Sequence, residues 1–210
     1  MTKKPAQPIG AVYLQDHRCR FRVWAPEYER IGVRLLKNSR LIPMERTRCG
    51  YHEAIVQDAQ PGDLYFFQLE DGNQRADPAS RLQPQGVHGP SAVVNPEFSW
   101  ADQDWRGLAL KDYIIYELHV GSFTAAGTFA ALTAYLDYFS ELGVTAIELM
   151  PIAQFPGARN WGYDGVYPFA AQNSYGGPAD LQMLVDACHR RGFAVILDVV
   201  YNHLGPNSGK

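Results

Sequence analysis

The sequence predicts a chain of two parts, an antiparallel β-sandwich followed by parallel β/α units. Two observations lead to this prediction. Between residues 19 and 94, short runs rich in β-branched and aromatic residues alternate with turn formers, and no helical pattern interrupts them. After residue 112, apolar runs alternate with segments of helical periodicity. A chain of 210 residues has room for two modest domains.

Four runs in the first half favour strands by their composition. They are CRFRVWAP (19–26), IGVRLL (31–36), HEAIV (52–56) and DLYFFQL (63–69). Turn formers at 60–63 and 70–73 flank the last of these runs. Because no helix connects the runs, we expect antiparallel pairing in a small β-sandwich.

Three runs in the second half predict strands that are buried on both faces. They are DYIIYELHV (112–120), VTAIELMPI (144–152) and FAVILDVV (193–200). A long loop-like segment precedes the first of them, and we expect residues 98–111 to connect the two parts.

Each interval between these strands predicts a helix. In the first, Thr128 is a helix cap and Gly143 ends the pattern. The apolar residues at helical spacing are Phe129, Leu132, Leu136 and Phe139. In the second, Pro178 is the first helical residue and Gly192 lies past the end. The apolar stripe there is Leu181, Leu184, Val185 and Cys188.

This order of strands and helices predicts a parallel sheet covered by helices. A doubly wound sheet and a (β/α)8 barrel share the pattern. The residues after the first strand are GSFTAAGT, which is not a GxGxxG phosphate loop, so nucleotide binding is disfavoured. The pattern alone leaves both architectures open.

Composition excludes several partners. A net charge of -3 and a pI near 6.1 give no electrostatic footprint for nucleic acid. No apolar run is long enough for a membrane span, and the basic N-terminus lacks the apolar core of a secretion signal. Cys19, Cys49 and Cys188 show neither metal-ligand nor disulfide spacing, so we expect buried free thiols in the cytoplasm.

Polar residues close the third apolar strand. Asp198 ends it, and Tyr201, Asn202 and His203 follow. Functional groups of a parallel barrel stand at the carboxyl ends of the strands. An acid at the end of an apolar strand is costly unless it is hydrogen-bonded or used. Each of these side chains has two interpretations, a structural contact with the local backbone or a contact with substrate or a cation.

The segment 153–178 is long for a connection between a strand and a helix, and long ordered loops are often functional. Its five aromatic residues are Trp161, Tyr163, Tyr167, Phe169 and Tyr175. They can offer flat rings to sugar faces. They can equally pack against one another and hold the loop together.

Four segments resemble the α-amylase superfamily of glycoside hydrolases. They are YELHVGSF (116–123), GVTAIELMP (143–151), FPGARNWGYDGVYPFAAQNSYGGP (155–178) and FAVILDVVYNHLGP (193–206). DVVYNH (198–203) is similar to the first conserved motif of that superfamily. FPG followed by WGYDG is similar to the trehalohydrolases rather than to glycogen-branching enzymes.

The resemblance implies a multi-domain organisation. A flexible tail at 1–8 precedes an immunoglobulin-like β-sandwich at 9–97, similar to a carbohydrate-binding module. After the connector, residues 112–210 would form the first three β/α units of an incomplete (β/α)8 TIM barrel.

The resemblance also implies a function for the parent protein. It would hydrolyse, with retention, the α-1,4-glucosidic bond next to the terminal trehalose of maltooligosyltrehalose. Tyr163 would stack on the glucose before the scissile bond, and Trp161 would also bind substrate. His203 would hydrogen-bond the same sugar, and Asp198 would hold the architecture of the site. Some relatives bind calcium at the position of Asn202, but we expect neither metal nor cofactor here.

The catalytic carboxylates of the superfamily follow its fourth, fifth and seventh strands. None of them maps onto a sequence that ends at Lys210. We therefore expect an N-terminal fragment that is inactive alone and whose partner is the rest of the barrel. Two alternatives stay open: a fragment of a branching or debranching enzyme, and a non-catalytic α-glucan-binding protein.

Overall fold

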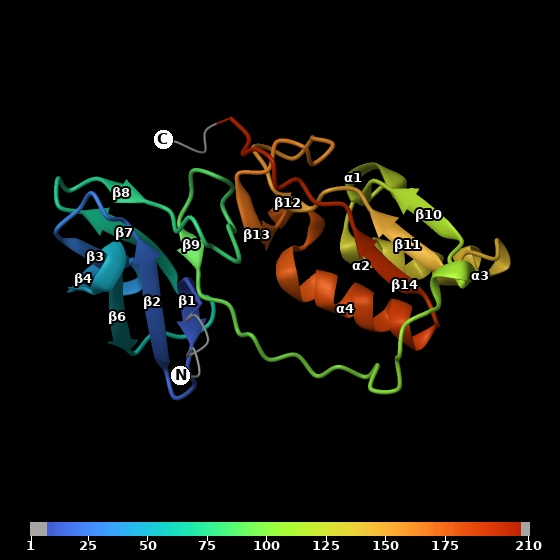
Figure 1. Cartoon of the computed structure of the whole chain (residues 1–210), viewed down its shortest axis with the longest axis horizontal. Coiled ribbons are helices and arrows are strands. Elements are labelled where there is room, and N and C mark those ends of the chain that lie inside the picture. Colours follow the sequence, from blue (N-terminus) through green and yellow to red (C-terminus); the bar gives the residue numbers. More distant parts are fainter. Residues whose placement is uncertain (1–7, 207–210) are drawn as a thin grey trace. The chain divides into compact units, whose positions relative to one another are not determined.

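The computed structural model describes residues 8–206 (Figure 1). The chain forms two compact units, Met1–Pro96 and Glu97–Lys210, and each is described by itself. The flexible tail predicted at 1–8 lies outside the described residues, except for Pro8. Within residues 8–206, no helix has the length and apolar character of a membrane span.

The first unit consists of two antiparallel sheets and two short 3-10 turns. One sheet has the order β1-β2-β6-β5 and comprises Gly10–Tyr13, Arg18–Trp24, Tyr51–Gln57 and Glu45–Arg46. The other has the order β4-β3-β7-β8, with β9 also on β7, and comprises Arg40–Pro43, Ile31–Leu35, Leu64–Leu69, Gln74–Arg75 and Ser91–Ala92. The 3-10 turns are Leu36–Asn38 and Arg48–Gly50.

The two sheets enclose one hydrophobic core. Alternate residues of β2 point into it, and so do alternate residues of β7. The rings of Phe21 and Tyr65 join the sheets edge to face, with centroids 4.8 Å apart. The four predicted strands correspond to β2, β3, β6 and β7 within two residues at each end. The other five strands span two to four residues, too short for a composition signal.

A buried carboxylate and a neighbouring arginine connect the segment 77–81 to β7 and to the start of this unit. Asp77 is fully buried and accepts hydrogen bonds from the Tyr65 hydroxyl at 2.6 Å and the Ala79 amide at 2.8 Å. Burial raises its pKa to about 6, and the hydrogen bonds oppose that rise. Nearby, the Arg81 guanidinium donates to the carbonyls of Ile9 and Ala11.

The second unit is built on a parallel sheet of order β10-β11-β14. These strands are Ile115–Leu118, Ala146–Leu149 and Ala194–Leu197, in register along their whole length. A 3-10 turn at Leu110–Asp112 precedes β10. Helices α1 (Val120–Phe123), α2 (Phe129–Leu132) and α3 (Leu136–Glu141) connect the first two strands, with a 3-10 turn at Thr133–Tyr135 between α2 and α3. A hairpin of β12 (Ala153–Gln154) and β13 (Tyr167–Ala171), a 3-10 turn at Asn173–Tyr175 and α4 (Gly177–Arg190) precede β14.

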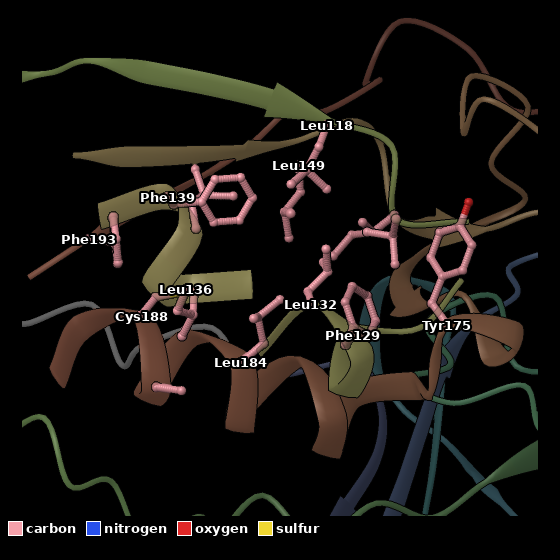
Figure 2. Packing of buried hydrophobic residues seen from close by; sticks show 14 of the residues in the cluster. Leu118, Phe129, Leu132, Leu136, Phe139, Leu149, Tyr175, Leu184, Cys188 and Phe193 are labelled. Atoms are coloured by element: carbon pink, nitrogen blue, oxygen red, sulfur yellow. The ribbon is translucent and has the colours of Figure 1, made fainter. Parts of the chain in front are cut away.

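The helix predicted from Thr128 to Gly143 is broken into three pieces. Thr128 caps α2 as expected, and its hydroxyl accepts from the Ala131 amide at 3.2 Å. The backbone then tightens into a 3-10 turn before α3. All four predicted apolar residues of this segment are nevertheless buried, because the pieces keep the same side toward the sheet. Figure 2 shows Phe129, Leu132, Leu136 and Phe139 between the sheet and α4.

The three strands are shorter than the apolar runs that predicted them. The run 112–120, for example, contributes only four residues to β10, and its last residue already begins α1. The second predicted helix is confirmed, although it begins at Gly177 and Pro178 is its second residue. Cys19 and Cys188 are buried as expected, whereas Cys49 is exposed, so the expectation of buried thiols is wrong at that residue.

The connector is tied to α4. The Ala101 amide donates to Asp186 Oδ1 at 2.6 Å, and Asp102 Oδ2 lies 2.6 Å from His189 Nδ1. The Trp105 ring stacks on the His189 ring, with centroids 4.8 Å apart. These contacts fix residues 101–105 on the surface of the second unit.

Candidate functional site

The carboxyl ends of the three parallel strands define the candidate site. Because the strands are in register, the residues that follow them lie along one edge of the sheet. His119 follows β10, Pro151 comes two residues after β11, and Asp198 follows β14. The loop with the β12–β13 hairpin leaves from this edge, and it carries WGYDG (161–165).

Two buried amides hold the base of this loop. The side chains of Gln154 and Gln172 are completely buried. Gln172 Oε1 accepts from the Phe155 amide at 3.0 Å, and its Nε2 donates to the Gly157 carbonyl at 2.9 Å. Gln154 Oε1 accepts from the Asn173 amide at 2.9 Å. Hydrogen bonds inside the unit therefore anchor the base of the loop.

The aromatic residues of the loop do not form one packed cluster. Tyr175 is buried and contacts Phe129 and Phe155 edge to face. In contrast, Trp161 and Phe169 are 73% and 59% exposed. The loop is thus ordered by the two amides and Tyr175, whereas the rings of Trp161 and Phe169 lie at the surface.

Tyr163 is held from two directions. Its hydroxyl donates to Asp198 Oδ2 at 3.0 Å, and its carbonyl oxygen lies 2.9 Å from His203 Nε2. The hydrogen bond to Asp198 is the main cause that raises the pKa of Tyr163, because it stabilises the protonated phenol. The carboxylates of Glu117 and Glu148 add to the rise. Tyr163 is still 39% exposed, so these contacts do not bury it.

Close backbone packing fixes the residues around Tyr163. Gly162 has a φ of +96°, and a Cβ there would lie 1.9 Å from the Pro151 carbonyl oxygen. Gly205 donates its amide to the Gly165 carbonyl at 2.8 Å, and a Cβ on it would lie 2.0 Å from the Asp164 carbonyl oxygen. Only glycine fits at either position without a backbone shift.

The structure therefore brings three of the predicted residues together, namely Tyr163, Asp198 and His203. Trp161 lies two residues from Tyr163 and points its ring largely into solvent. Asn202 is exposed and lines a shallow pocket with His203. An apolar cavity of about 200 Å³ lies beside the site, with Leu181, Leu197 and Asp198 in its wall.

Four polar residues of this region did not emerge from the sequence. Glu117 and Glu148 are cross-strand neighbours on the face of the sheet opposite to Leu118 and Leu149, which pack in the core. The sequence signal for them was a charged residue inside each of two apolar strands. His119 directly follows β10, so the strand-end rule could have found it. The role of Asn160 depends on the folded loop.

Comparison with known proteins places these features in a family. Residues 71–209, well over half of the chain, match the family model described as alpha amylase, catalytic domain. A malto-oligosyltrehalose trehalohydrolase from Saccharolobus solfataricus is 49% identical over 193 residues, covering 92% of this chain. A 1,4-α-glucan branching enzyme from Corynebacterium efficiens is 33% identical over 200 residues, covering 87% of this chain.

A solved structure agrees with the sequence matches. The crystal structure of a candidate α-amylase from Salmonella typhimurium aligns over 97% of this chain with a TM-score of 0.91 and 42% identity. The chain spans 34% of the length of the Saccharolobus relative and 35% of the Salmonella chain. It thus corresponds to about a third of either protein.

Proposed function

The chain belongs to the α-amylase family, and on that premise we propose that it is the N-terminal part of a retaining glycoside hydrolase. The proposed reaction is hydrolysis of the α-1,4-glucosidic bond next to the terminal trehalose of maltooligosyltrehalose, which releases trehalose. The observation that carries this proposal is Tyr163, which is 39% exposed and is fixed at the strand ends by Asp198 and His203.

The choice of substrate rests on the loop and on the relatives. Identity is 49% to the Saccharolobus trehalohydrolase and 33% to the Corynebacterium branching enzyme. FPG at 155–157 and WGYDG at 161–165 lie in the loop that surrounds the site. This combination supports a trehalohydrolase over a branching or debranching enzyme.

Each site residue has a proposed role. The Tyr163 ring stacks on the glucose just before the scissile bond, and the exposed Trp161 offers a second flat surface to the glucan. Asp198 positions Tyr163 through the phenol hydroxyl. His203 contributes to binding of the same sugar while its Nε2 contacts the loop backbone.

The bond cleavage itself requires groups that we propose lie elsewhere in the parent protein. Retaining hydrolysis needs two carboxylates about 5–5.5 Å apart, a nucleophile and an acid/base. We assign neither role to this chain. The three strands would be the first part of a (β/α)8 barrel, and the sandwich would be its immunoglobulin-like N-terminal domain. The rest of the barrel is then the proposed structural partner.

The proposal is tested by product analysis. The full-length parent protein should release free trehalose from maltooligosyltrehalose, and the purified 210-residue chain should release none. Transfer of glucan chains with formation of branches would identify a branching enzyme instead. Binding of α-glucan without turnover by the full-length protein would identify a binding protein. Trehalose release by the 210-residue chain would show that the catalytic groups lie within it.

A further inference from the structure

We propose, building on the function proposed above, that His119 and Asn160 are positioning residues that fasten the 160–165 loop segment to β10 and so orient the ring of Tyr163. Neither residue is among those predicted from the sequence. His119 follows β10, the edge strand away from β14, and Asn160 lies in the loop between β12 and β13.

The imidazole of His119 is held in one orientation. Its Nδ1 lies 2.9 Å from Ser122 Oγ, and its Nε2 lies 2.7 Å from the carbonyl oxygen of Asn160. A carbonyl can only accept, so Nε2 carries a proton, and in the neutral imidazole Nδ1 then accepts from the serine hydroxyl. The Tyr175 hydroxyl lies 3.0 Å from the same Nε2. Burial raises the pKa of Tyr175 to about 12, so this neighbour is a neutral phenol.

The side chain of Asn160 hydrogen-bonds to the residues on both sides of Tyr163. Its Oδ1 accepts from the Gly162 amide at 2.8 Å, and its Nδ2 donates to Asp164 Oδ2 at 2.7 Å. The two ends of the carboxamide thus play different roles, since its oxygen can only accept and its NH2 can only donate. The residues before and after Tyr163 are therefore fixed to one amide, whose own backbone is fixed to His119.

The loop segment is consequently fastened at both edge strands of the sheet. On the β14 side, Asp198 and His203 hold the hydroxyl and the carbonyl of Tyr163. On the β10 side, the restraint runs through His119 and Asn160. If the second restraint is lost, Tyr163 can pivot about its contacts with β14. An aromatic ring that pivots stacks less well on a sugar, so the rate should fall without any loss of a substrate contact.

Two near-isosteric substitutions separate this role from simple packing. In His119→Gln, the side-chain NH2 takes the place of Nε2–H and can still donate to the Asn160 carbonyl. In His119→Asn, the amide reaches only the position of Nδ1, so that hydrogen bond is lost. The exposed His88 of the other unit, replaced by Gln, is the matched control.

The first measurement is trypsin cleavage of the 210-residue chain after Arg159. This exposed residue is the only Lys or Arg between residues 153 and 178. Relative to cleavage after Lys111, cleavage after Arg159 should be about tenfold faster in His119→Asn, which loses one hydrogen bond to the loop. The increase should be at least as large in Asn160→Ala, which loses two. His119→Gln and His88→Gln should be cleaved at the wild-type rate.

The second measurement is hydrolysis of maltooligosyltrehalose by the full-length parent protein. We expect His119→Asn to lower kcat/KM about tenfold and His119→Gln to stay within about twofold of wild type. Equal behaviour of the Asn and Gln variants in both measurements would overturn the positioning role. An inactive wild-type parent would instead refute the proposed function, and the trypsin comparison would still decide whether His119 holds the loop.

Discussion

The phenol hydroxyl of Tyr163 and the carboxylate of Asp198 are joined by a hydrogen bond of 3.0 Å, although 35 residues separate them in the sequence. The bond links the loop after β11 to the first residue after β14. It gives Asp198 a structural partner at the strand end and gives Tyr163 a fixed ring direction. The ring and the hydroxyl of Tyr163 can therefore be tested separately.

Replacement of Tyr163 by Ala should reduce kcat/KM of the parent enzyme by roughly 10- to 100-fold, which corresponds to a loss of about 1–3 kcal/mol in stacking. Tyr163→Phe keeps the ring and loses only the hydrogen bond to Asp198, so its loss should be clearly smaller. Steady-state kinetics together with thermal unfolding would check both. Full activity of Tyr163→Ala, or equal losses in the two variants, would contradict a stacking role for the ring.

Asp198→Asn should move the pKa of Tyr163 back down toward its ordinary value. The carboxylate favours the protonated phenol by accepting its hydrogen bond and by its negative charge, and both contributions weaken in the amide. NMR titration of the 210-residue chain with labelled tyrosine rings at alkaline pH would measure it, with the Tyr163 signal assigned among the twelve tyrosines as the one missing in Tyr163→Phe. An unchanged midpoint would mean that the hydrogen bond to Asp198 is not formed in solution.

His203→Ala should lower kcat and raise KM of the parent enzyme. The substitution removes a proposed sugar contact and also the contact of Nε2 with the Tyr163 carbonyl. His203→Gln should restore part of the activity, because its amide can donate to the same carbonyl. If only KM changed, His203 would bind the ground state and the transition state equally. Wild-type kinetics in the Ala variant would leave no role for it in the reaction.

Asp77 should make the first unit less stable as the pH rises. Its pKa of about 6 in the folded state lies above the ordinary value of 3.8, so folding favours the protonated carboxyl. The stabilisation is complete below about pH 4 and is lost as the pH rises through about 6, with an upper bound on the order of 3 kcal/mol. Urea unfolding of wild type and Asp77→Asn between pH 4 and pH 7.5 would measure it. The wild type should lose stability relative to the variant, whereas parallel curves would contradict a raised pKa.

Local patterns predicted the strongest elements and failed where the fold depends on distant contacts. β2, β3, β6, β7 and α4 follow from composition and periodicity, because their apolar residues face one core. The hairpin of β12 and β13 lies in a stretch rich in Gly and Pro, and its pairing shifts register between Ala153 and Gln154. Its order comes from the buried side chains of Gln154 and Gln172, whose hydrogen bonds no local pattern specifies.

In the candidate site, too, some residues follow from local sequence patterns and others depend on contacts made only in the folded chain. Asp198 and His203 could be selected from the residues alone, because they close an apolar strand. Tyr163 could be selected from its place in the aromatic loop together with the family resemblance. Asn160 could not be selected, since its importance arises from three contacts that exist only after the loop has folded.

The crowded glycines at the site determine which positions of the loop can accept substitutions. Gly162 and Gly205 have no room for a side chain, whereas Trp161 and Tyr163 point partly into solvent. Mutational libraries that spare the two glycines and vary the two rings should therefore retain the loop conformation while they sample new ligands. The same division would let either ring change by a single substitution while the crowded backbone around it stays in place.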